Sequence, residues 1–576
     1  MRLAIIHKEK CKPLACGGVC KNVCPVNKKG EVECVKIVNK AEIDESLCVG
    51  CGICQKRCPF EAIEIINLPS VKEENLIYRY GDNGFALYGL PTPKEGGILG
   101  LLGRNGIGKS TAIEILSGKK EINLGINATK EQIKEHFQGS ELLRYFDSLK
   151  GKKIAYKPQN LSSLAVDLKV KELLKKRGSE KEIIALAERL NVSHILDNKL
   201  NKLSGGELQK VAILAATLQE SDIYFFDEPL AYLDISERLR VSDYIREIAE
   251  KKKTILIIEH DLIILDYLTD YLNIFYGQQG CFGSVSGVKA TRYGINSYLH
   301  GFLKEENLRI RDKEISFNFN KNSQVAGRVL SKWPSFEKHF DSFSLKAEEG
   351  EIRENHVIGI LGKNGTGKTS FVKCLAGLEE VTMDGKKQKL DLKINISYKP
   401  QYLFVSEDER VADIIRSEKI NKKLASMFNL ESIHQKKITE LSGGELQRFS
   451  IARCLSKDAD IYLIDEPSAY LDVEERISCA KSIKEIMTEK QKTAFVVDHD
   501  LLLISYLADS IIVFSGEPGR KGKATKVLGF EEGISILLKD LNITLRKDKE
   551  SGRPRINNPG SVLDRTQKSE GKWVAF

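Results

Sequence analysis

Cysteines near the start of the chain have a spacing that could bind a metal cluster. Cys48, Cys51, Cys54 and Cys58 are separated by two, two and three residues, and Pro59 follows the last of them. In bacterial ferredoxins this spacing lets three cysteines hold one four-iron cluster while the fourth binds a second cluster. Zinc sites use paired ligands that lie farther apart, and disulfides are rare in cytosolic proteins, so both are weaker alternatives.

A second cysteine run has a wider spacing but ends in the same Cys-Pro pair, Cys24 and Pro25. Because the fourth cysteine of a run reaches the other cluster, we expect the two runs to exchange their last ligands. One cluster is expected on Cys24, Cys48, Cys51 and Cys54. The other is expected on Cys11, Cys16, Cys20 and Cys58. Cys34 is left over, and the scattered later cysteines are expected to be buried apolar residues: Cys281, Cys374, Cys454 and Cys479.

Two glycine-rich loops each follow a short apolar run and precede a helical pattern, a context that identifies phosphate-binding loops. Backbone N–H groups approach the phosphates at the start of the helix, and Lys109 and Lys368 would reach the terminal phosphates. Ser110 and Thr369, which follow the lysines, would ligate magnesium. The loops are 103-GRNGIGKS-110 and 362-GKNGTGKT-369. Further residues expected to bind ATP are Gly103, Asn105, Gly106, Gly108, Thr111, Gly362, Asn364, Gly365, Gly367 and Ser370.

Two buried-strand patterns end in Asp-Glu and supply acidic groups for this chemistry. Asp227 and Asp465 stand at the ends of these strands, so we expect them to bind magnesium. The adjacent Glu228 and Glu466 are candidate general bases, because a carboxylate beside the γ-phosphate can position and polarise the attacking water. Two glutamines in a repeated Lys-Pro-Gln motif are further expected magnesium ligands: Gln159 and Gln401.

Histidines close two further apolar strands at matching positions. His260 follows the first strand and His499 the second, with EHD around the former and DHD around the latter. A lone histidine after a strand is usually structural, but two at matched positions favour a sensor of the γ-phosphate. We therefore group His260 and His499 with the catalytic glutamates.

The chain contains one module twice, because 203-LSGGELQK-210 recurs as 441-LSGGELQR-448 and the KPQ, DEP and AYLD motifs recur in the same order. The first copy is longer between its phosphate loop and its glutamine. Two short helix-period stripes, broken at Gly139-Ser140, lie in that extra length. We expect a helix–loop–helix insert near residues 130–153, which is either a surface decoration or a contact device.

These motifs, in this order, resemble the nucleotide-binding domains of ATP-binding cassette proteins. The resemblance implies two cassettes docked head to tail, with each ATP held between the phosphate loop of one and the LSGGE signature of the other. ATP would then join the halves, and its hydrolysis would release them. Carried over, Ser442, Gly444 and Glu445 face the nucleotide on Lys109. Ser204, Gly206 and Glu207 face the nucleotide on Lys368.

An aromatic residue that stacks on adenine is expected before each phosphate loop. Tyr80 and Phe85 are candidates in the first copy, and Trp333 is a candidate in the second. Their spacing does not choose among them.

Composition describes an ordinary folded protein of several units. The chain has 576 residues, 41% hydrophobic and 29% charged, and no apolar run long enough to span a membrane. No signal pattern precedes the cysteines, so we expect a cytoplasmic location. The net charge of +9 fits a lysine-rich surface or a nucleic-acid partner equally well.

Ferredoxin-like cysteine runs ahead of two fused cassettes are similar to subfamily E of the cassette proteins, the RNase L inhibitor type, which recycles ribosomes in archaea and eukaryotes. The chain is archaeal-like in this resemblance, which rests on 59-PFEAIEIINLPS-70, 137-FQGSELLRYF-146, 292-RYGINSYLHGFLKEENLRIR-311 and 553-RPRIN-557. The resemblance implies that the insert touches ribosomal RNA and that the two arginine-rich segments form a hinge. It also implies a monomer that meets the small ribosomal subunit, a termination or rescue release factor, and initiation factors.

The expected fold is α/β: two tandem P-loop cassettes, head to tail, behind a ferredoxin-like α+β domain with two four-iron clusters. The expected cofactors are these clusters, ATP and magnesium, and the expected activity is ATP hydrolysis coupled to ribosome splitting. An ATP-gated electron carrier and a soluble transporter subunit are the alternatives. The expected domains are 1–72 (iron–sulfur), 73–290 (first cassette), 291–318 (hinge), 319–540 (second cassette) and 541–576 (C-terminal hinge segment).

Overall fold

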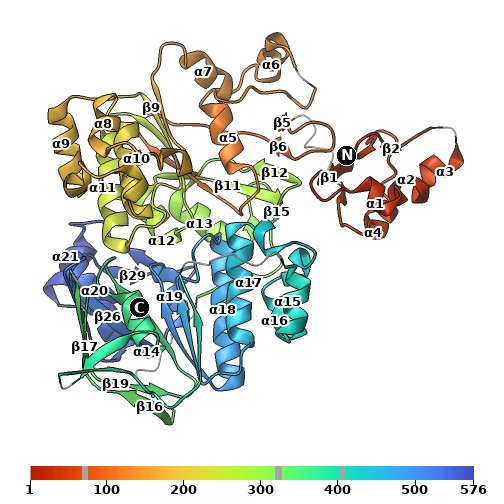
Figure 1. Ribbon diagram of the computed structural model, residues 1–576. Helices are drawn as coiled ribbons and strands as arrows, with labels where there is room; N and C mark the ends of the chain where they lie inside the picture. The colour runs from red at the N-terminus through yellow and green to blue at the C-terminus, as the bar shows by residue number, and fades with distance from the viewer. Residues whose placement is uncertain are drawn as a thin grey trace.

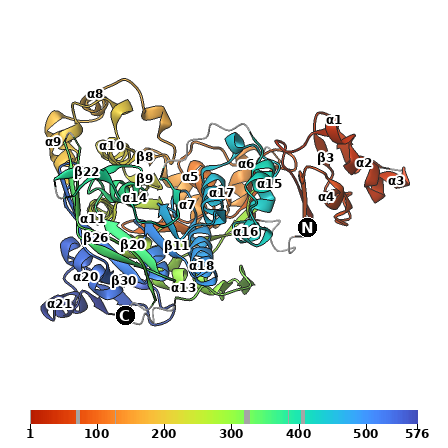
Figure 2. The ribbon, with the colours of Figure 1, turned by 60° about the horizontal axis from the view of Figure 1, so that its bottom comes forward.

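Three bodies make up the protein in the computed structural model (Figure 1). A small N-terminal body lies to one side, and the two cassettes lie against each other with the C-terminus on the second. Figure 2 shows the same separation of the N-terminal body from another direction. The structure describes residues 2–30, 32–67, 75–126, 128–317, 327–340, 342–383, 385–401 and 409–575. The boundaries expected at residue 72 and at residues 318–319 lie outside these ranges.

The N-terminal body contains short elements around a core of sulfur atoms. Strand β1 pairs antiparallel with β4, and β2 with β3. Six cysteines belong to its buried core, together with small and branched apolar residues. A body of this size has too few apolar side chains for a robust core, so what the thiols bind contributes to its stability. Its elements are β1 (Arg2–Ile6), α1 (Pro13–Cys16), α2 (Val19–Val23), α3 (Pro25–Lys29), β2 (Val35–Ile37), β3 (Ala41–Ile43), α4 (Ile53–Arg57) and β4 (Ile63–Asn67).

Polar contacts hold the N-terminal body against the first cassette. The Asn83 side chain accepts from Ile43 N at 2.8 Å and donates to Ile43 O at 3.0 Å, and the backbone carbonyl of Asn83 accepts from Ile6 N. Arg79 forms a bidentate ion pair with Glu45, an arrangement that fixes orientation as well as distance. The body is therefore docked on the cassette in this structure.

The first cassette is built on a twisted sheet whose central strands run parallel in the order β11-β7-β10-β9-β8. Alternate residues of β7 enter different cores: Ile98 packs in one and Leu99 in another. Both faces are thus covered, which explains the unbroken apolar strands. Its elements are β5 (Leu76–Arg79), β6 (Ala86–Tyr88), β7 (Ile98–Leu102), α5 (Lys109–Leu116), α6 (Lys130–His136), α7 (Glu141–Ser148), β8 (Ile154–Lys157), α8 (Val170–Lys175), α9 (Glu180–Arg189), α10 (Gly205–Thr217), β9 (Ile223–Asp227), α11 (Ile235–Glu250), β10 (Thr254–Ile258), α12 (Leu262–Leu268), β11 (Tyr271–Gln278), β12 (Phe282–Val285) and β13 (Lys289–Ala290).

The second cassette repeats this order, with parallel strands β26-β20-β25-β24-β23. Helices α12 and α19 contact each other across the seam between the cassettes. Its elements are β16 (Val329–Trp333), β17 (Phe336–His339), β18 (Ser344–Ala347), β19 (Gly350–Arg353), β20 (Val357–Gly362), α14 (Lys368–Leu375), β21 (Glu380–Met383), β22 (Lys386–Lys389), β23 (Ile396–Lys399), α15 (Val411–Ser417), α16 (Lys422–Met427), α17 (Gly443–Ser456), β24 (Ile461–Asp465), α18 (Val473–Lys490), β25 (Thr493–Val497), α19 (Leu501–Leu507), β26 (Ser510–Glu517), β27 (Lys521–Ala524), β28 (Leu528–Gly529) and α20 (Phe530–Leu541).

Helices α6 and α7 occupy the region where the sequence predicts an insert. Thr129 caps α6 and Ser140 caps α7, each accepting a backbone hydrogen bond at the third residue of its helix. Phe137 and Tyr145 are buried in the cassette core, and the Tyr145 hydroxyl donates to Leu116 O at 2.9 Å. The pair of helices is thus anchored on the first cassette while its outer faces stay exposed.

The segments after each cassette meet at the seam. Arg292 in α13 donates to Asp548 of the C-terminal segment at 2.9 Å, and Arg553 donates to Asp266 of the first cassette at 3.0 Å. Both acids are almost fully buried, so the pairs are shielded from solvent. The elements are α13 (Thr291–His300), β14 (Phe302–Leu303), β15 (Leu308–Arg309), β29 (Leu545–Lys547), β30 (Pro554–Ile556), α21 (Val562–Ser569) and β31 (Val574–Ala575).

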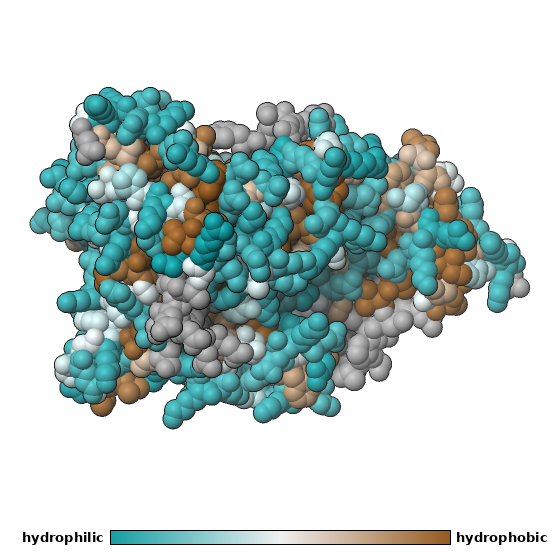
Figure 3. All heavy atoms as spheres, turned by 90° about the horizontal axis from the view of Figure 1, so that it is seen from below, coloured by the Kyte–Doolittle hydropathy of each residue, from teal (hydrophilic) through white to brown (hydrophobic). Residues whose placement is uncertain are grey.

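The face of the molecule drawn in Figure 3 is mostly polar, and apolar side chains gather on the N-terminal body at its right. Leu14, Val32, Val38, Val49 and Ile53 are exposed there, and Leu14 fully so. Across the described ranges, no helix has the length and apolar character needed to cross a bilayer.

Candidate functional site

Each phosphate loop connects a buried strand, β7 or β20, to a helix that starts at the loop lysine. Lys109 Nζ donates to the carbonyls of Gly103 and Arg104 at 2.7 and 2.6 Å. Burial lowers the pKa of Lys109, and it lowers that of Lys368 to about 8. A phosphate at the loop would raise both pKa values, because a nearby anion favours the charged form of the lysine.

Glycine is required at the last loop position before the lysine. Gly108 and Gly367 have φ of +95° and +96°, and a Cβ on either would lie 2.9 Å from an aromatic ring, that of Phe85 or Phe343. A side chain there would displace the ring or the loop. The two copies therefore share the same close approach between loop and aromatic residue.

Carboxylates suited to magnesium stand at the ends of β9 and β24. Asp227 is buried, and neither of its carboxylate oxygens has a hydrogen-bond partner among the described residues. Burial and the neighbouring Glu228 raise its pKa to about 6. In the second cassette, Thr369 Oγ1 donates to Asp465 Oδ2 at 2.8 Å and Asp465 Oδ1 is similarly unpaired. Buried oxygens left open in this way fit a cation.

The candidate bases lie between a glutamine and a histidine in both cassettes. Gln159 Nε2 donates to Glu228 Oε1 at 2.7 Å, and His260 Nε2 lies 3.3 Å from the same oxygen. Burial acts to raise the pKa of Glu228, but His260 and Lys109 lower it to about 2. Glu228 is therefore an anion at neutral pH, as a base must be.

The second base has the same neighbours but a different charge balance. Gln401 Nε2 donates to Glu466 Oε1 at 2.7 Å, and His499 Nε2 lies 3.6 Å from that oxygen. Burial and the charge of Asp465 raise the pKa of Glu466. Burial also lowers the pKa of His499 well below its usual value, so this histidine is neutral.

Left-handed backbone conformations occur after strands β9 and β24, at equivalent places in the two cassettes. Glu228 and Glu466 have φ of +45° and +47°, and Tyr232 and Tyr470 both have φ of +64°. Left-handed backbone is costly for these residue types and is typical of functional sites. The fold keeps it in both copies.

Contacts across the seam come from the aspartates of the AYLD motifs. Asp472 Oδ2 accepts from Asn105 N of the first phosphate loop at 2.9 Å, and Asp234 Oδ2 accepts from Asn364 N of the second at 2.7 Å. We did not predict either aspartate as a site residue, although the repeated AYLD motif was the available signal. Each phosphate loop thus donates a backbone hydrogen bond to an aspartate of the opposite cassette.

The side chains of the signature residues form hydrogen bonds within their own cassettes. Ser204 and Ser442 cap helices α10 and α17, with Glu207 and Glu445 completing capping boxes. Their role toward the opposite nucleotide stays a prediction.

Paired aromatic residues precede both phosphate loops. Tyr80 packs near Phe85, with ring centroids 6.4 Å apart, and Phe340 packs near Phe343 at 6.0 Å. Tyr80 and Phe340 are each about 40% exposed, so a flat ligand could reach them. Trp333 was the wrong candidate in the second copy, because it lies in the core.

The contacts of the Trp333 indole explain why this residue is buried. Trp333 Nε1 donates to Glu348 O at 2.9 Å, and its ring packs on Phe371 and Phe495. Phe340 is not among the candidates from the sequence, because the contact between its ring and that of Phe343 is visible only in the structure.

The N-terminal cysteines gather in two groups. Burial and the charges of Cys11, Cys16 and Cys58 raise the pKa of Cys20. Burial and the charges of Cys48, Cys51 and Cys24 raise the pKa of Cys54 to about 11. Each group therefore draws one thiol from the other run. Cys34 lies beside Cys24 and Cys48, next to the second group.

Comparisons with known proteins match this architecture. A family model described as ABC transporter matches residues 92–231 and 345–469. A model described as "Possible Fer4-like domain in RNase L inhibitor, RLI" matches residues 1–31, and a 4Fe-4S binding domain matches residues 41–64. ABC transporter E family member 1 of Arabidopsis thaliana is 40% identical over 99% of this chain and 98% of its own length.

This chain belongs to the E family of ATP-binding cassette proteins. A solved structure of ribosome-bound archaeal Pelota and ABCE1 has a TM-score of 0.93 at 44% identity, and the match covers 100% of this chain and 99% of that one. A complex of archaeal stalk protein aP1 with ribosome recycling factor aABCE1 has a TM-score of 0.82 at 43% identity, over 88% and 99% of the two chains. The E-family assignment confirms the predicted fold: an ATPase with two cassettes behind an iron–sulfur domain.

Proposed function

We propose that this E-family protein is a ribosome recycling factor that uses ATP to split ribosomes into subunits after termination or rescue. The observation that carries this proposal is its full-length likeness to an archaeal relative bound to a ribosome with Pelota. Partners of this kind are the small subunit with its RNA, a release factor of the Pelota type, and initiation factors. One chain holds both ATP sites, so the proposed factor works as a monomer, and its ribosomal partners imply a cytoplasmic location.

The geometry of each site supports the following mechanism of ATP hydrolysis. Lys109 and the loop amides bind the phosphates, and Glu228 takes a proton from the attacking water. The neutral His260, beside Glu228, is placed to bond the γ-phosphate. Glu466, Lys368 and His499 do the same in the second cassette.

Magnesium would be held by a loop hydroxyl and the strand-end carboxylate in each cassette, with the nearby glutamine completing the set. When bound, it neutralises charge on the phosphates. The residues are Ser110, Gln159 and Asp227 in the first site, and Thr369, Gln401 and Asp465 in the second.

Two four-iron clusters fit the two groups of thiols. Each cluster would take three cysteines from one run and one from the other, so the runs are tied together through Cys24 and Cys58. We assign one cluster to Cys11, Cys16, Cys20 and Cys58. The other is assigned to Cys24, Cys48, Cys51 and Cys54.

The clusters make the N-terminal body rigid, so it can transmit force as one piece. Its exposed apolar residues, including Leu14 and Val38, offer a contact surface for a partner. Helices α6 and α7 offer a second contact, to ribosomal RNA. The hinge is formed by Arg292 and Arg553 with the buried acids at the seam.

The decisive experiment combines ribosome splitting with co-sedimentation. Purified ribosomes with a release factor should split only when ATP is present, and the protein should then sediment with small subunits. The Glu228→Gln, Glu466→Gln double variant should bind without turning over. Lack of association under any nucleotide would overturn the proposal.

An electron carrier is the competing function, and redox control separates it. Shifting the cluster potential without unfolding should leave splitting unchanged if the clusters are structural. A splitting rate that tracks the redox state would favour the carrier instead.

A further inference from the structure

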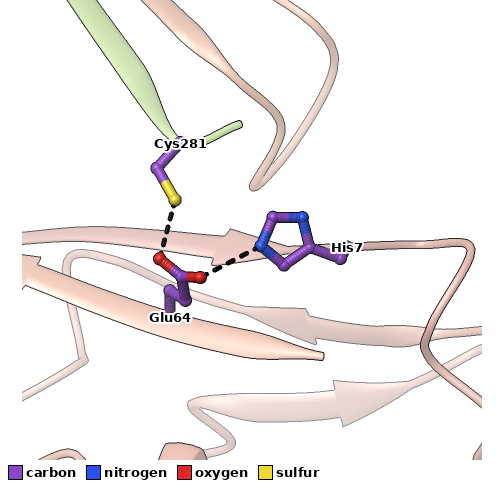
Figure 4. A group of neighbouring side chains, drawn as sticks. All are labelled: His7, Glu64 and Cys281. Atoms are coloured by element: carbon purple, nitrogen blue, oxygen red, sulfur yellow. Dashed lines mark hydrogen bonds and ion pairs between the residues drawn. The ribbon is translucent and has the colours of Figure 1, made fainter. Parts of the chain in front are cut away.

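A group of metal-binding side chains lies where the N-terminal body meets the first cassette. His7, Glu64 and Cys281 offer ligand atoms that all lie within 4.8 Å of one another. His7 follows β1 and Glu64 lies in β4, whereas Cys281 comes from the turn between β11 and β12. Figure 4 shows the His7 ring and the Cys281 thiol pointing at the Glu64 carboxylate. The group therefore joins two bodies that are distant in the sequence.

The distances within this group are close to those between ligands of one ion. His7 Nε2 lies 3.3 Å from Glu64 Oε1, and Cys281 Sγ donates to Glu64 Oε2 at 2.8 Å. Ligands of tetrahedral zinc, with bonds of about 2.0 to 2.3 Å, lie about 3.5 Å from each other. Modest side-chain rotations bring the three atoms to that spacing.

We propose that His7, Glu64 and Cys281 bind one zinc ion that clamps the N-terminal body to the first cassette. Imidazole nitrogen, carboxylate oxygen and thiolate sulfur are the ligand types that zinc takes. On binding, the Cys281 proton passes to solvent, and the thiolate and the Glu64 carboxylate balance the two charges of the ion. A water molecule completes the four ligands.

Neighbouring residues support the three ligands. His7 Nδ1 lies 3.7 Å from Glu9 Oε1, so a proton on Nδ1 leaves Nε2 free for the metal. Gln278 donates to Glu64, which orients the carboxylate. Cys281 is fully buried against Ile5 and Tyr88, so solvent competes weakly for its sulfur. Burial and Glu64 raise the pKa of the Cys281 thiol, so the metal must displace its proton, and the charge of Lys10 nearby also opposes a cation.

The experiment compares Cys281→Ser with Cys374→Ser in the full chain with its clusters intact. Serine keeps a hydroxyl that can donate to Glu64 but is a poor zinc ligand, which isolates metal binding from the hydrogen bond. Cys374 is an equally buried cysteine in the second cassette and serves as the control. Each protein is incubated with zinc chloride, desalted, and measured for zinc and iron by mass spectrometry.

The expected result is about one zinc per chain in the wild type and in Cys374→Ser, and a loss of at least about tenfold in Cys281→Ser at unchanged iron. X-ray absorption at the zinc edge should show one sulfur near about 2.3 Å and nitrogen or oxygen near about 2.0 Å. Equal zinc in Cys281→Ser and Cys374→Ser would overturn the proposal. A shell of four sulfurs would also overturn it, because the zinc would then lie at the cluster cysteines.

Discussion

The two ATP sites contain the same residues in the same places, yet their electrostatics differ. The pKa of Glu228 is lowered to about 2, mainly through His260, whereas that of Glu466 is raised. The histidine lies 3.3 Å from the base in the first site and 3.6 Å in the second. Duplicated motifs thus do not imply duplicated reactivity, because charge depends on the surroundings of each base.

The residue before each histidine also differs between the two sites. Glu259 accepts from Leu230 N at 2.8 Å, and its pKa is raised to about 7 by burial. The shorter Asp498 accepts from both the amide and the hydroxyl of Ser468, at 3.0 and 2.7 Å. The first site therefore has the longer acid, Glu259, without a hydroxyl partner. The second site has the shorter acid, Asp498, with one.

The seam is also unequal. Arg104 of the first phosphate loop pairs with Glu474 of the second cassette, and Arg311 bonds the same acid at 2.7 Å. At the position that matches Glu474, the first cassette has Ser236, and Lys363 of the second loop pairs with Asp540 of its own cassette at 2.7 Å. The first phosphate loop is therefore held across the seam by more bonds than the second.

The largest expected effect is the loss of a base. Glu228→Gln and Glu466→Gln should each slow hydrolysis at their own site by about 100- to 10,000-fold, since proton transfer to the base is lost. Single-turnover assays with radiolabelled ATP would measure each site. Glu247→Gln, at an exposed acid that pairs with Arg189 in the first cassette, is the control. Undiminished turnover in the double variant would rule out both bases.

The second-largest effect should distinguish the two aspartate contacts at the seam between the cassettes. Asp234→Asn should weaken ATP-driven closure by about tenfold or more, because a charge-assisted hydrogen bond contributes about 1.5 to 3 kcal/mol. Asp472→Asn should cost less, because Arg104 and Glu474 still join that loop to the opposite cassette. ATP binding measured by calorimetry compares the two.

Asp460→Asn is the matched control for these variants, since Asp460 accepts from Asn395 N at 3.0 Å within one cassette. Equal losses for Asp234→Asn and Asp472→Asn would show that the extra ion pair does not matter.

A smaller effect should appear as pH falls. The raised pKa of Glu466 means that it gains a proton at a higher pH than Glu228, whose pKa is lowered to about 2. As the pH is lowered, ATPase activity left in Glu228→Gln should thus be lost at a higher pH than the activity left in Glu466→Gln. Rate profiles of the two variants test this order, and a reversed order would contradict it.

The smallest effect concerns the aromatic residues. The Tyr80 hydroxyl lies 3.1 Å from Thr111 Oγ1 and bonds Lys120, whereas Phe340 has no hydroxyl. Tyr80→Phe should make the first site resemble the second and change ATP affinity by less than about 1 kcal/mol. Tyr80→Ala, which removes the ring, should weaken binding more, and equal effects would argue against stacking.

Sequence spacing predicts the fold and most of the site because the motifs are short and contiguous. A phosphate loop is complete within eight residues, so Lys109 and Ser110 are placed by the strand and helix on either side of them. The grouping of Cys58 with Cys11, Cys16 and Cys20 also follows from ferredoxin spacing. Local patterns of this kind need no knowledge of packing.

Contacts between distant segments are harder to predict. Asp472 meets Asn105 across 367 positions, and although the repeated AYLD motif marks the aspartate, it does not say which residue the aspartate contacts. Trp333 lies at a plausible distance before its phosphate loop, but its burial depends on Phe371 and Phe495. The charge difference between Glu228 and Glu466 also arises from packing rather than from the motifs.

The aspartate contacts at the seam couple binding to shape. Asp472 uses Oδ1 to cap helix α18 and Oδ2 to accept from the opposite phosphate loop. Helix α18 runs from Val473 to Lys490, a length of about 27 Å at the usual rise. A shift of the loop amide would therefore move the N-terminal end of helix α18 in the other cassette. Its far end could move by more than the loop itself.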